Sequence, residues 1–309
     1  MKNRSTRAER QVRAAGTART RVAILGSGSI GIDLMFKVKA CEQFDLAFVV
    51  GRNADSDGLR LARECHVATS SDGLEFLRAN ADAYDLVFDA TSAAAHTQHN
   101  RFFAEAGKFA IDLTPAKVGR LCVPCINLPD THAVQNVNLI TCGGQASLPL
   151  AYALRQAVDE IDYLEVVSAI ASRSAGMATR ENINEYQTTT EYALAKFSGA
   201  KRTKAILNIN PAEPGIQMQT TLYAHARYRD FGWVRSRIEA MVEQVREYVP
   251  GYQLVVQPLE SQGRITVSLT VRGRGDYLPE YAGNLDIINC AALAVATHRH
   301  ATLRSGVTQ

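Results

Sequence analysis

The sequence lacks most of the features that mark secreted, membrane or nucleic-acid-binding proteins. Its 309 residues contain six cysteines, scattered along the chain with no secretory leader ahead of them, which is typical of reduced thiols in the cytoplasm. No apolar run is long enough to span a bilayer. The net charge is only +3, without a basic stripe interleaved with aromatic residues, so no nucleic-acid partner is expected. These absences leave a cytoplasmic globular protein of one large or two ordinary domains.

Metal-ligand spacings are also scarce. Cys122 and Cys125 have the spacing of a zinc or redox pair, but no second pair completes a zinc site and the pair does not open a predicted helix. His298 and His300 have ligand-like spacing, and we expect them at a solvated helix end near the C-terminus. The sequence therefore predicts no metal site.

Residues 1–20 are rich in Arg, Ala, Thr and Ser, with a single acidic residue. Such a composition cannot bury a core, so a disordered basic tail is expected. An organelle transit peptide has a similar composition and stays open as an alternative.

A glycine-rich turn follows the tail. Arg21 begins a short apolar strand that leads into Gly26-Ser-Gly-Ser-Ile-Gly31, and Ile32 to Ala40 have helical spacing. A Gly-x-Gly-x-x-Gly turn between a strand and a helix lets a pyrophosphate approach the helix N-terminus. The stretch predicts a dinucleotide site.

Strands and helices then alternate, which predicts a Rossmann-type parallel sheet with helices on both faces. The expected strands are 46–51, 86–91 and 109–113, and the expected helices are 58–65 and 96–106. Asp89-Ala-Thr-Ser92 falls at the sheet edge where such folds bind ligands.

Cys142 lies at the next strand-to-helix corner, in Thr141-Cys-Gly-Gly-Gln145. A helix is expected from Leu148 to Ile161, with Pro149 in its first turn. Partial positive charge and free N–H groups at a helix start stabilise a thiolate, and the two glycines leave room for a carbonyl. Cys142 is therefore a candidate nucleophile, although most free cysteines are structural.

The pattern changes after this corner. Strands are expected at 164–171, 205–210, 217–226, 253–259 and 264–271, and helices at 183–197 and 233–248. This predicts a mixed or antiparallel sheet with helices on one face. A final apolar helix, Asn284 to His298, is expected to pack back on the first domain. The predicted domains are 21–145 for the dinucleotide, completed by helix 284–303, and 146–283 for catalysis and dimerisation.

With the motifs at 26–31 and 141–145, Ser172-Arg-Ser-Ala-Gly176 and Tyr281-Ala-Gly-Asn-Leu-Asp286 in view, the chain resembles the acylating acetaldehyde dehydrogenases. The resemblance covers nearly everything from Arg21 to about Ala301. It implies a glyceraldehyde-3-phosphate-dehydrogenase-like architecture and oxidation of a short aldehyde, acetaldehyde or propanal, to its coenzyme A thioester with NAD. It further implies a homodimer or larger assembly and, in aromatic or sterol catabolism, a 4-hydroxy-2-oxoacid aldolase partner.

The resemblance also implies roles for particular residues. Cys142 carries the acyl group. The implied cofactor contacts are Gly26, Ser27, Gly28, Ser29, Ile30, Ser174, Ala175, Gly176, Met177, Ala178, Thr179, Arg180, Glu181, Asn182 and Asn284.

Four departures from the family pattern bear on this interpretation. Met177-Ala178 replaces Pro-Gly in the cofactor loop, Gln219-Thr220-Thr221 replaces Arg-Asp-Thr, and the stretch after Leu259 is shorter. Gly51-Arg52-Asn53 replaces Gly-Ile-Asp after the second strand. Because an arginine fork matches phosphate, this last change leaves NADP open as an alternative cofactor.

Two other functions stay open. A semialdehyde or phosphate-acceptor dehydrogenase of the same architecture normally needs a histidine base, for which His225 is the only candidate in the second domain. A catalytically eroded partner subunit would have no reason to keep a bare thiol at a helix N-terminus. Both are less favoured than a coenzyme A-dependent enzyme.

Overall fold

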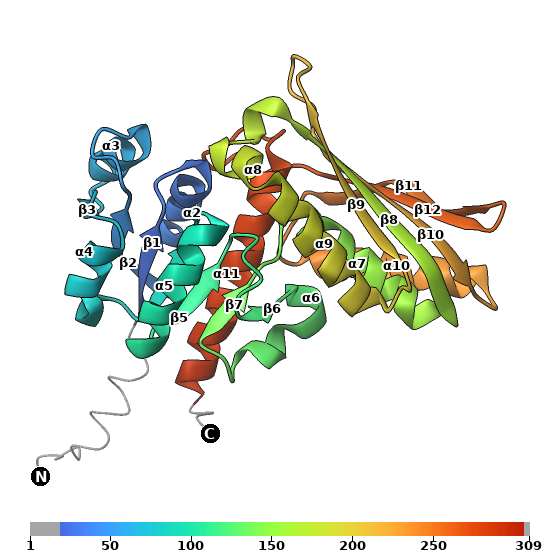
Figure 1. Cartoon of the computed structure of the whole chain (residues 1–309), viewed down its shortest axis with the longest axis horizontal. Coiled ribbons are helices and arrows are strands. Elements are labelled where there is room, and N and C mark those ends of the chain that lie inside the picture. Colours follow the sequence, from blue (N-terminus) through green and yellow to red (C-terminus); the bar gives the residue numbers. More distant parts are fainter. Residues whose placement is uncertain (1–18, 306–309) are drawn as a thin grey trace, which may run out of the picture.

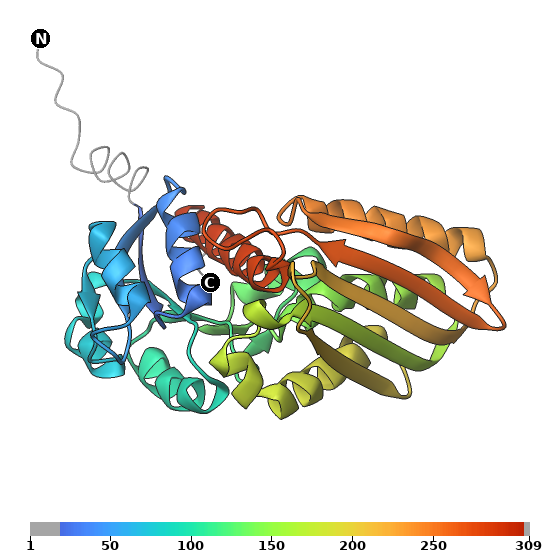
Figure 2. The same ribbon diagram turned by 90° about the horizontal axis from the view of Figure 1, so that it is seen from above.

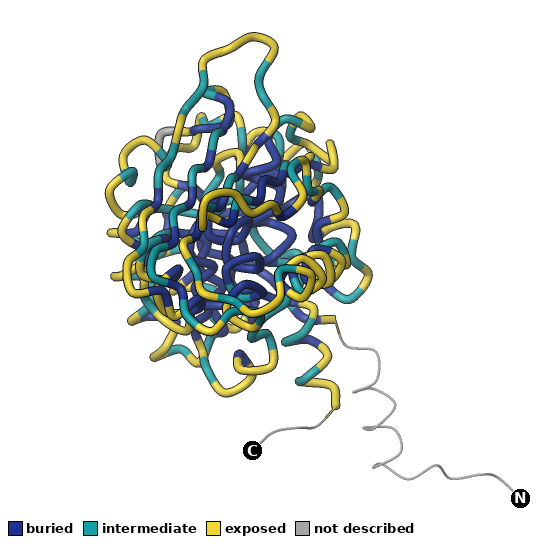
Figure 3. The backbone as a smooth tube through the Cα atoms, turned by 90° about the vertical axis from the view of Figure 1, so that its right-hand side faces the viewer, coloured by how far each residue is buried: buried dark blue, intermediate teal, exposed yellow. Residues whose placement is uncertain are grey.

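The computed structural model describes residues 19–305, except the side chains of residues 177 and 178. The predicted basic tail lies almost wholly outside the described residues. Two sheets lie side by side, each with its own helices (Figure 1). The buried segments gather in the interior of the molecule, and the exposed segments lie at its outside (Figure 3). Among the described residues, no helix is long and apolar enough to cross a membrane.

The first sheet has seven strands in the order β3-β2-β1-β4-β5-β7-β6, all parallel. The strands are β1 (Thr20–Leu25), β2 (Phe44–Val50), β3 (Thr69–Ser70), β4 (Leu86–Asp89), β5 (Phe109–Asp112), β6 (Arg120–Leu121) and β7 (Asn136–Asn138). Strand order reverses between β1 and β4, and a crevice for ligands forms at the carboxyl ends of such strands. The predicted parallel sheet is confirmed.

Helices cover both faces of this sheet. They are α2 (Ser29–Lys39), α3 (Asp57–Glu64), α4 (Leu74–Ala79), α5 (Ala93–Glu105) and α6 (Pro124–Asn127), with short 3-10 turns η1 (Ala81–Ala83) and η2 (Leu128–Thr131). Apolar side chains of α2 and α3 pack on one face, and those of α4 and α5 pack on the other. The short elements β3, α4, β6 and α6 were not predicted from the sequence.

The second sheet has five strands in the order β11-β12-β10-β8-β9. They are β8 (Glu160–Ala171), β9 (Thr203–Asn210), β10 (Met218–Arg227), β11 (Tyr252–Ser261) and β12 (Arg264–Val271). Only β8 and β9 pair in parallel, so the sheet is mixed, as expected. The long helices α7 (Cys142–Ala157), α9 (Ile183–Ser198) and α10 (Phe231–Arg246) pack on one side of it (Figures 1 and 2). The turn η3 (Ser172–Ser174) and the short helix α8 (Met177–Glu181) connect β8 to α9.

The last helix, α11 (Gly283–Arg304), joins the two halves. Its residues Ile288, Ala292 and Val295 lie in the core beneath the first sheet, whereas Ile287 belongs to the core of the second. The prediction that this helix returns to the first domain is confirmed. His300 is buried and hydrogen-bonds Thr20 at 2.8 Å, so the expectation of a solvated end was wrong there.

The start of α7 also differs from the prediction. The helix begins at Cys142, and Pro149 lies inside it rather than in its first turn. Thr141 explains the earlier start, because its hydroxyl accepts a hydrogen bond from the Gly144 N–H at 2.8 Å and caps the helix. The proline then costs the helix one interior hydrogen bond, that of the Gln145 carbonyl.

Candidate active site

Cys142 is the first residue of α7, at the strand-to-helix corner that the sequence predicted. The capping hydroxyl of Thr141 lies 2.8 Å from the hydroxyl of Thr190, which fixes the helix start against α9. The Cys142 sulfur receives hydrogen bonds from the Gly143 N–H and from the hydroxyl of Tyr186, on α9. Neutral donors from two helices therefore surround the thiol.

The ionisation of this thiol differs from the expectation. Burial raises the pKa of Cys142 to about 11, and the Gly143 N–H and Tyr186 hydroxyl lower it by less. The expectation rested on the helix terminus alone. The surrounding side chains also remove water from the sulfur, which disfavours the charged thiolate and raises the pKa. Without a ligand, the sulfur is a protonated thiol at neutral pH.

Cys142 lines a small cavity of about 90 Å³. The lining contains four other predicted site residues, Ile30, Thr179, Asn182 and Asn284. The remaining lining residues are Ala90, Thr91, Leu113, Thr114, Pro115, Ile140, Thr141, Tyr186, Leu285 and Ile288. No carboxylate, imidazole, ammonium or guanidinium group is among these described side chains, so the cavity around the sulfur is uncharged.

A second cavity of about 420 Å³ lies at the glycine-rich turn. Gly26, Ser27 and Gly28 line it together with Arg52 and Asn53, and Glu181 also reaches it. Both cavities are lined by Ala90 and Thr91, so they adjoin at the carboxyl ends of β1 and β4, and together they are called the groove below. The groove runs from the turn to Cys142.

The glycine turn fits a dinucleotide. Gly28 caps α2 without a side-chain hydrogen bond, and a Cβ there would meet open space. A Cβ on Gly31 would lie 1.9 Å from the Gly26 carbonyl, so only glycine allows the tight turn. Free N–H groups at the start of α2 therefore face the groove, as a pyrophosphate requires.

Two buried polar atoms at the Cys142 end also fit a ligand. The Asn284 side chain donates to the Ser174 carbonyl at 3.2 Å, while its Oδ1 is buried without a partner. The Thr114 hydroxyl is also buried and unpartnered. An acceptor and a hydroxyl that line one cavity match a carboxamide such as that of nicotinamide.

Other predicted contacts line neither cavity. Ser29, Ser174, Ala175, Gly176 and Arg180 are absent from both linings. Arg180 instead donates to the Ala175 and Ser172 carbonyls and so holds its own loop together. The side chains of Met177 and Ala178 lie outside the described residues. Cofactor roles for these residues stay predictions.

Thr220, from the stretch that departs from the family pattern, is linked to the sulfur through two other side chains. Its hydroxyl lies 2.9 Å from that of Ser168, and Ser168 in turn hydrogen-bonds Tyr186. Sequence reasoning missed Tyr186 and Ser168, because a tyrosine on a helix and a serine in a strand look like ordinary core positions. The candidate histidine base, His225, is exposed and hydrogen-bonds the Gly263 carbonyl, away from the cavity.

A buried network of acids and imidazoles lies behind the groove and was also missed. Asp89 accepts hydrogen bonds from His96 (2.9 Å) and His99 (2.7 Å), and His96 lies 3.4 Å from Asp112. Burial opposes ionisation of Asp89, but the two imidazoles lower its pKa to about 2. Burial and the charge of Asp89 raise the pKa of Asp112 to about 7. Asp89 also accepts from the Thr91 hydroxyl, so the network reaches the lining of the groove.

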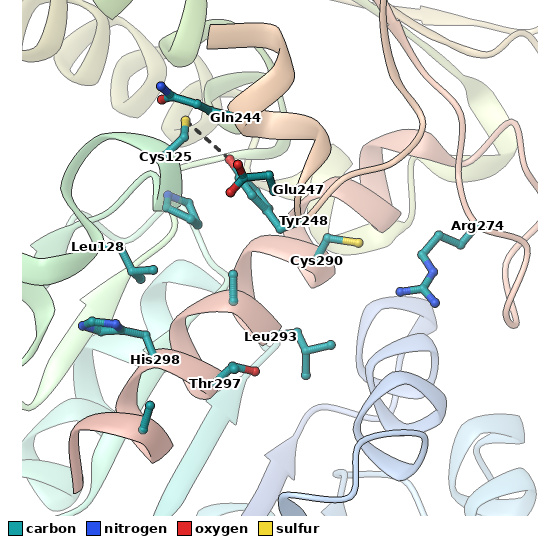
Figure 4. A pocket seen from close by; sticks show the side chains of 13 residues that line it. Cys125, Leu128, Gln244, Glu247, Tyr248, Arg274, Cys290, Leu293, Thr297 and His298 are labelled. Carbon is teal, nitrogen blue, oxygen red and sulfur yellow. Dashed lines mark hydrogen bonds between the residues drawn. The ribbon is translucent and has the colours of Figure 1, made fainter. Parts of the chain in front are cut away.

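A third cavity, of about 860 Å³, is lined by another face of α11 and by α6 and the end of α10. Figure 4 shows it with the hydrogen bond from Tyr248 to Cys125 on one side and Arg274 on the other. Its lining contains none of the predicted site residues, although Cys125 and His298 from the two ligand-like spacings are part of it. No group of three or more His, Cys, Asp or Glu side chains within residues 19–305 could hold a metal ion.

Comparison with known proteins identifies the family. Residues 142–279 match the family described as "Prokaryotic acetaldehyde dehydrogenase, dimerisation", and residues 21–130 match "Semialdehyde dehydrogenase, NAD binding domain". The acetaldehyde dehydrogenase of Burkholderia pseudomallei (strain 668) is 84% identical over 293 residues, which cover 95% of this chain and 99% of that protein. The acetaldehyde dehydrogenase of Spirochaeta aurantia is 51% identical, covering 89% of this chain and 93% of its own length.

Solved structures agree on the fold. Aspartate semialdehyde dehydrogenase II from Vibrio cholerae, complexed with ASA, has a TM-score of 0.60 and 15% identity, covering 91% of this chain and 98% of its own. The Candida albicans aspartate semialdehyde dehydrogenase with NADP also gives 0.60, at 13% identity and with 90% and 99% coverage. The two-sheet architecture is therefore that of the semialdehyde dehydrogenases. With the family matches and the full-length relatives, it follows that this chain belongs to the acetaldehyde dehydrogenase family of enzymes.

Proposed function

We propose that the protein is a coenzyme A-acylating aldehyde dehydrogenase. It converts a short aldehyde, coenzyme A and NAD⁺ to the acyl-coenzyme A and NADH through a thioester on Cys142. The observation that carries this proposal is the position of Cys142, in an uncharged cavity at one end of a groove whose other end is the dinucleotide turn.

Cys142 performs the covalent step. Its thiol loses a proton to solvent, the sulfur electron pair forms a bond to the aldehyde carbon, and the carbonyl π pair moves to oxygen. The N–H groups at the start of α7 are the donors nearest to the oxygen that becomes negative. Loss of hydride from the resulting hemithioacetal leaves the thioester on Cys142, and the thiolate of coenzyme A releases the acyl group.

The groove holds the cofactor in this proposal. Gly26 to Gly28 and the start of α2 bind the pyrophosphate, and Asn284 with Thr114 binds the carboxamide. The nicotinamide, when bound, supplies the hydride acceptor and a positive charge that favours the thiolate.

The uncharged lining supports a thiol as the acyl acceptor. Water needs a general base to attack a thioester, and phosphate needs cations to hold it, but neither lines the cavity among the described residues. A thiol needs less help, because its pKa of about 8.5 leaves a few per cent as thiolate at neutral pH.

The same lining supports a small unsubstituted aldehyde. A semialdehyde that carries a carboxylate or an ammonium group would need a charged partner there, and His225 does not face the cavity. The cavity of about 90 Å³ also receives the carboxamide in this proposal, which leaves room for a short aldehyde such as acetaldehyde or propanal.

The test follows NADH formation at 340 nm with acetaldehyde or propanal, in the presence of coenzyme A, phosphate or neither. We expect turnover only with coenzyme A, and none in Cys142→Ser. When coenzyme A is left out, mass spectrometry should find an acyl increment on the peptide that contains Cys142.

Two results would overturn the proposal. Equal rates of NADH formation with coenzyme A, with phosphate and with neither would show that coenzyme A is not the acyl acceptor. An acyl increment on Cys122 or Cys125 would show that Cys142 is not the nucleophile. Inactivity under every condition, with folding intact, would instead favour the eroded partner subunit.

Assembly is part of the proposal. The match to a dimerisation family supports an oligomer, and we propose a homodimer through the second sheet. A 4-hydroxy-2-oxoacid aldolase partner rests on the family resemblance alone, and co-purification with such an aldolase tests it.

A further inference from the structure

One side chain from outside α7 contacts the reactive sulfur. Tyr186, in the first turn of α9, is buried, and its hydroxyl hydrogen-bonds Cys142. The same oxygen receives hydrogen bonds from the Gly143 N–H and from Ser168. Because these two groups donate to the phenol oxygen, its own proton is directed at the sulfur.

Two buried hydroxyls continue this arrangement into the second sheet. Ser168 of β8 and Thr220 of β10 are each about 1% exposed, and their hydroxyl oxygens lie 2.9 Å apart. The two residues are paired across neighbouring strands, so the sheet fixes their separation. Thr220 is hydrogen-bonded to Ser168, Ser168 to Tyr186, and Tyr186 to the sulfur, in a chain without a charged member.

Gly143 is the third observation. A Cβ at this position would lie 1.9 Å from the Tyr186 hydroxyl oxygen and 3.1 Å from the Ser168 hydroxyl oxygen. Only glycine allows the phenol to reach the sulfur past the backbone of α7. The position of the Tyr186 hydroxyl therefore requires glycine at position 143.

We propose that Tyr186 is a further catalytic residue, whose hydroxyl donates a hydrogen bond to the Cys142 thiolate while Ser168 and Thr220 hold that hydroxyl in place. The inference rests on the proposed function only in taking Cys142 as the nucleophile. Ser168 and Thr220 are positioning residues, since they act through Tyr186.

Tyr186 acts as a donor rather than a base. Burial and the neighbouring sulfur raise the pKa of Tyr186 well above its ordinary value, so it keeps its proton at working pH. The proton of the Cys142 thiol leaves to solvent, and Tyr186 stays neutral throughout. A donor to a charged sulfur strengthens as the charge forms, which favours the thiolate over the thiol.

Other titratable groups reach the cavity only indirectly. The nearest members of the first sheet, Asp89 and Asp112, accept hydrogen bonds from Thr91 and from the Thr114 N–H, which line the cavity. From α7 and α9, the groups at the sulfur are the N–H of Gly143 and the Tyr186 hydroxyl. Removal of the phenol hydroxyl therefore changes the ionisation of Cys142 without removing a charge.

The test uses Tyr186→Phe, which removes one oxygen and keeps the buried ring. Iodoacetamide alkylation of Cys142 in the full-length enzyme is followed by mass spectrometry of its peptide between pH 7 and pH 10.5. We expect the alkylation rate of the variant at pH 8 to fall about tenfold, because one pKa unit of thiolate stabilisation is lost. Tyr192→Phe, on the exposed side of the same helix, is the matched control and should overlay the parent.

Ser168→Ala provides a second, independent arm. The alkylation profile should shift in the same direction as in Tyr186→Phe, but by less. The tyrosine keeps its proton and loses only one of the two groups that donate to its oxygen. In turnover assays both variants should lower kcat while the KM for aldehyde stays within about twofold.

A Tyr186→Phe profile that overlays the parent would overturn the inference, as would a change confined to KM. These outcomes are distinct from a failure of the proposed function. If Cys142→Ser abolishes turnover while Tyr186→Phe changes nothing, the nucleophile stands and the tyrosine does not contribute.

Discussion

Arg52 stands where a carboxylate normally accepts the ribose hydroxyls of NAD. Its side chain lines the dinucleotide end of the groove beside Asn53. Asp55 and Asp57 follow closely and could replace that carboxylate, but neither lines this cavity, and Asp57 pairs with Arg60 at 2.7 Å. The one carboxylate among these described lining residues is that of Glu181, on α8, rather than a residue after β2, so the turn after β2 presents the Arg52 guanidinium, which can bind a 2′-phosphate.

The first prediction concerns cofactor choice. Arg52→Ala should lower kcat/KM for NADP about tenfold, with a change of less than threefold for NAD, because one charge-assisted contact to phosphate is lost. Titration of protein fluorescence with each cofactor gives the same comparison without turnover. Arg60→Ala is the control, and a wild-type preference for NAD by several orders of magnitude would contradict the prediction.

The second prediction concerns Thr220. The carboxylate of Thr220→Asp would be buried beside Ser168 and would accept a hydrogen bond from its hydroxyl. Ser168 would then no longer donate to Tyr186. The charge of the carboxylate would also oppose a thiolate nearby. We expect a second ionisation in the pH profile of kcat/KM and a thiol pKa raised by about one unit.

Gln156→Glu, at the exposed far end of α7, serves as the control for Thr220→Asp. If the pH profile of Thr220→Asp overlays that of the parent, Thr220 is not coupled to the sulfur.

At the scale of elements, one buried lysine joins α2 to α11. The ammonium of Lys37 lies 2.7 Å from Asp286, 2.7 Å from Asp276 and 3.0 Å from Asp33. Its side chain is 1% exposed, and its acidic partners raise its pKa. The cluster fixes the helix that carries Asn284 against the helix that follows the glycine turn.

The third prediction follows from this cluster. Lys37→Met should lower the free energy of unfolding by about 3–5 kcal/mol, because Asp33 and Asp286 are left buried and unpaired. Urea unfolding measures the loss. Lys39→Met, exposed on the same helix, should change stability by less than about 0.5 kcal/mol. Lys37→Met with Asp286→Asn should recover part of the loss, and a stable single variant would refute the role of the cluster.

The fourth prediction concerns the ionisation of Asp112, at the end of β5. The pKa of Asp112 is raised to about 7 in the fold, so its contribution to stability is complete below its ordinary pKa near 4 and is lost as pH rises through 7. The raised pKa of His96 acts in the same direction. Asp89 titrates near 2 and does not change in this range.

Asp112→Asn removes the titrating group. Between pH 5 and pH 8, the stability of the variant relative to the parent should therefore rise by about 1–2 kcal/mol. Urea unfolding at several pH values measures the trend. Asp130→Asn, an exposed partner of Arg120, is the control, and parallel curves for parent and Asp112→Asn would exclude ionisation of Asp112 in this range.

At the scale of the whole molecule, helices pack on one side of the second sheet, and its other face carries Val167 and Tyr223. Val167 alternates with the buried Val166 and Ser168, so it points away from the helices. A second copy of the chain would cover this face in the proposed dimer.

The fifth prediction tests that assembly. Light scattering after gel filtration should give a multiple of 33.7 kDa for the parent and 33.7 kDa for Val167→Glu, because a carboxylate cannot be buried unpaired in an interface. Trp233→Glu, exposed on α10, should leave the parent mass unchanged. A monomeric parent would contradict the prediction.

Much of this architecture follows from local patterns in the sequence. The glycine turn, the alternation of strands and helices, and Cys142 at a helix start depend on residues within one turn of each other. Tyr186 and Lys37 could not be predicted in this way, because their partners other than Asp33 lie 18 to 249 residues away and meet only after packing. The predicted start of α7 was wrong because prolines prefer the first turn of a helix, whereas here the cap at Thr141 starts the helix earlier and leaves Pro149 inside it. The boundaries between domains stay predictions.

The return of α11 to the first sheet has a consequence for biosynthesis. The ribosome makes β1 and β4 first, yet the apolar surface around Ile24 and Phe88 is shared with Ala292 and Val295 of α11, which are made after both sheets. Nascent domains commonly fold as they emerge, but the core of the first sheet lacks part of its apolar contacts until α11 has been made. A chain that stops before α11 would therefore keep part of this apolar surface exposed to solvent.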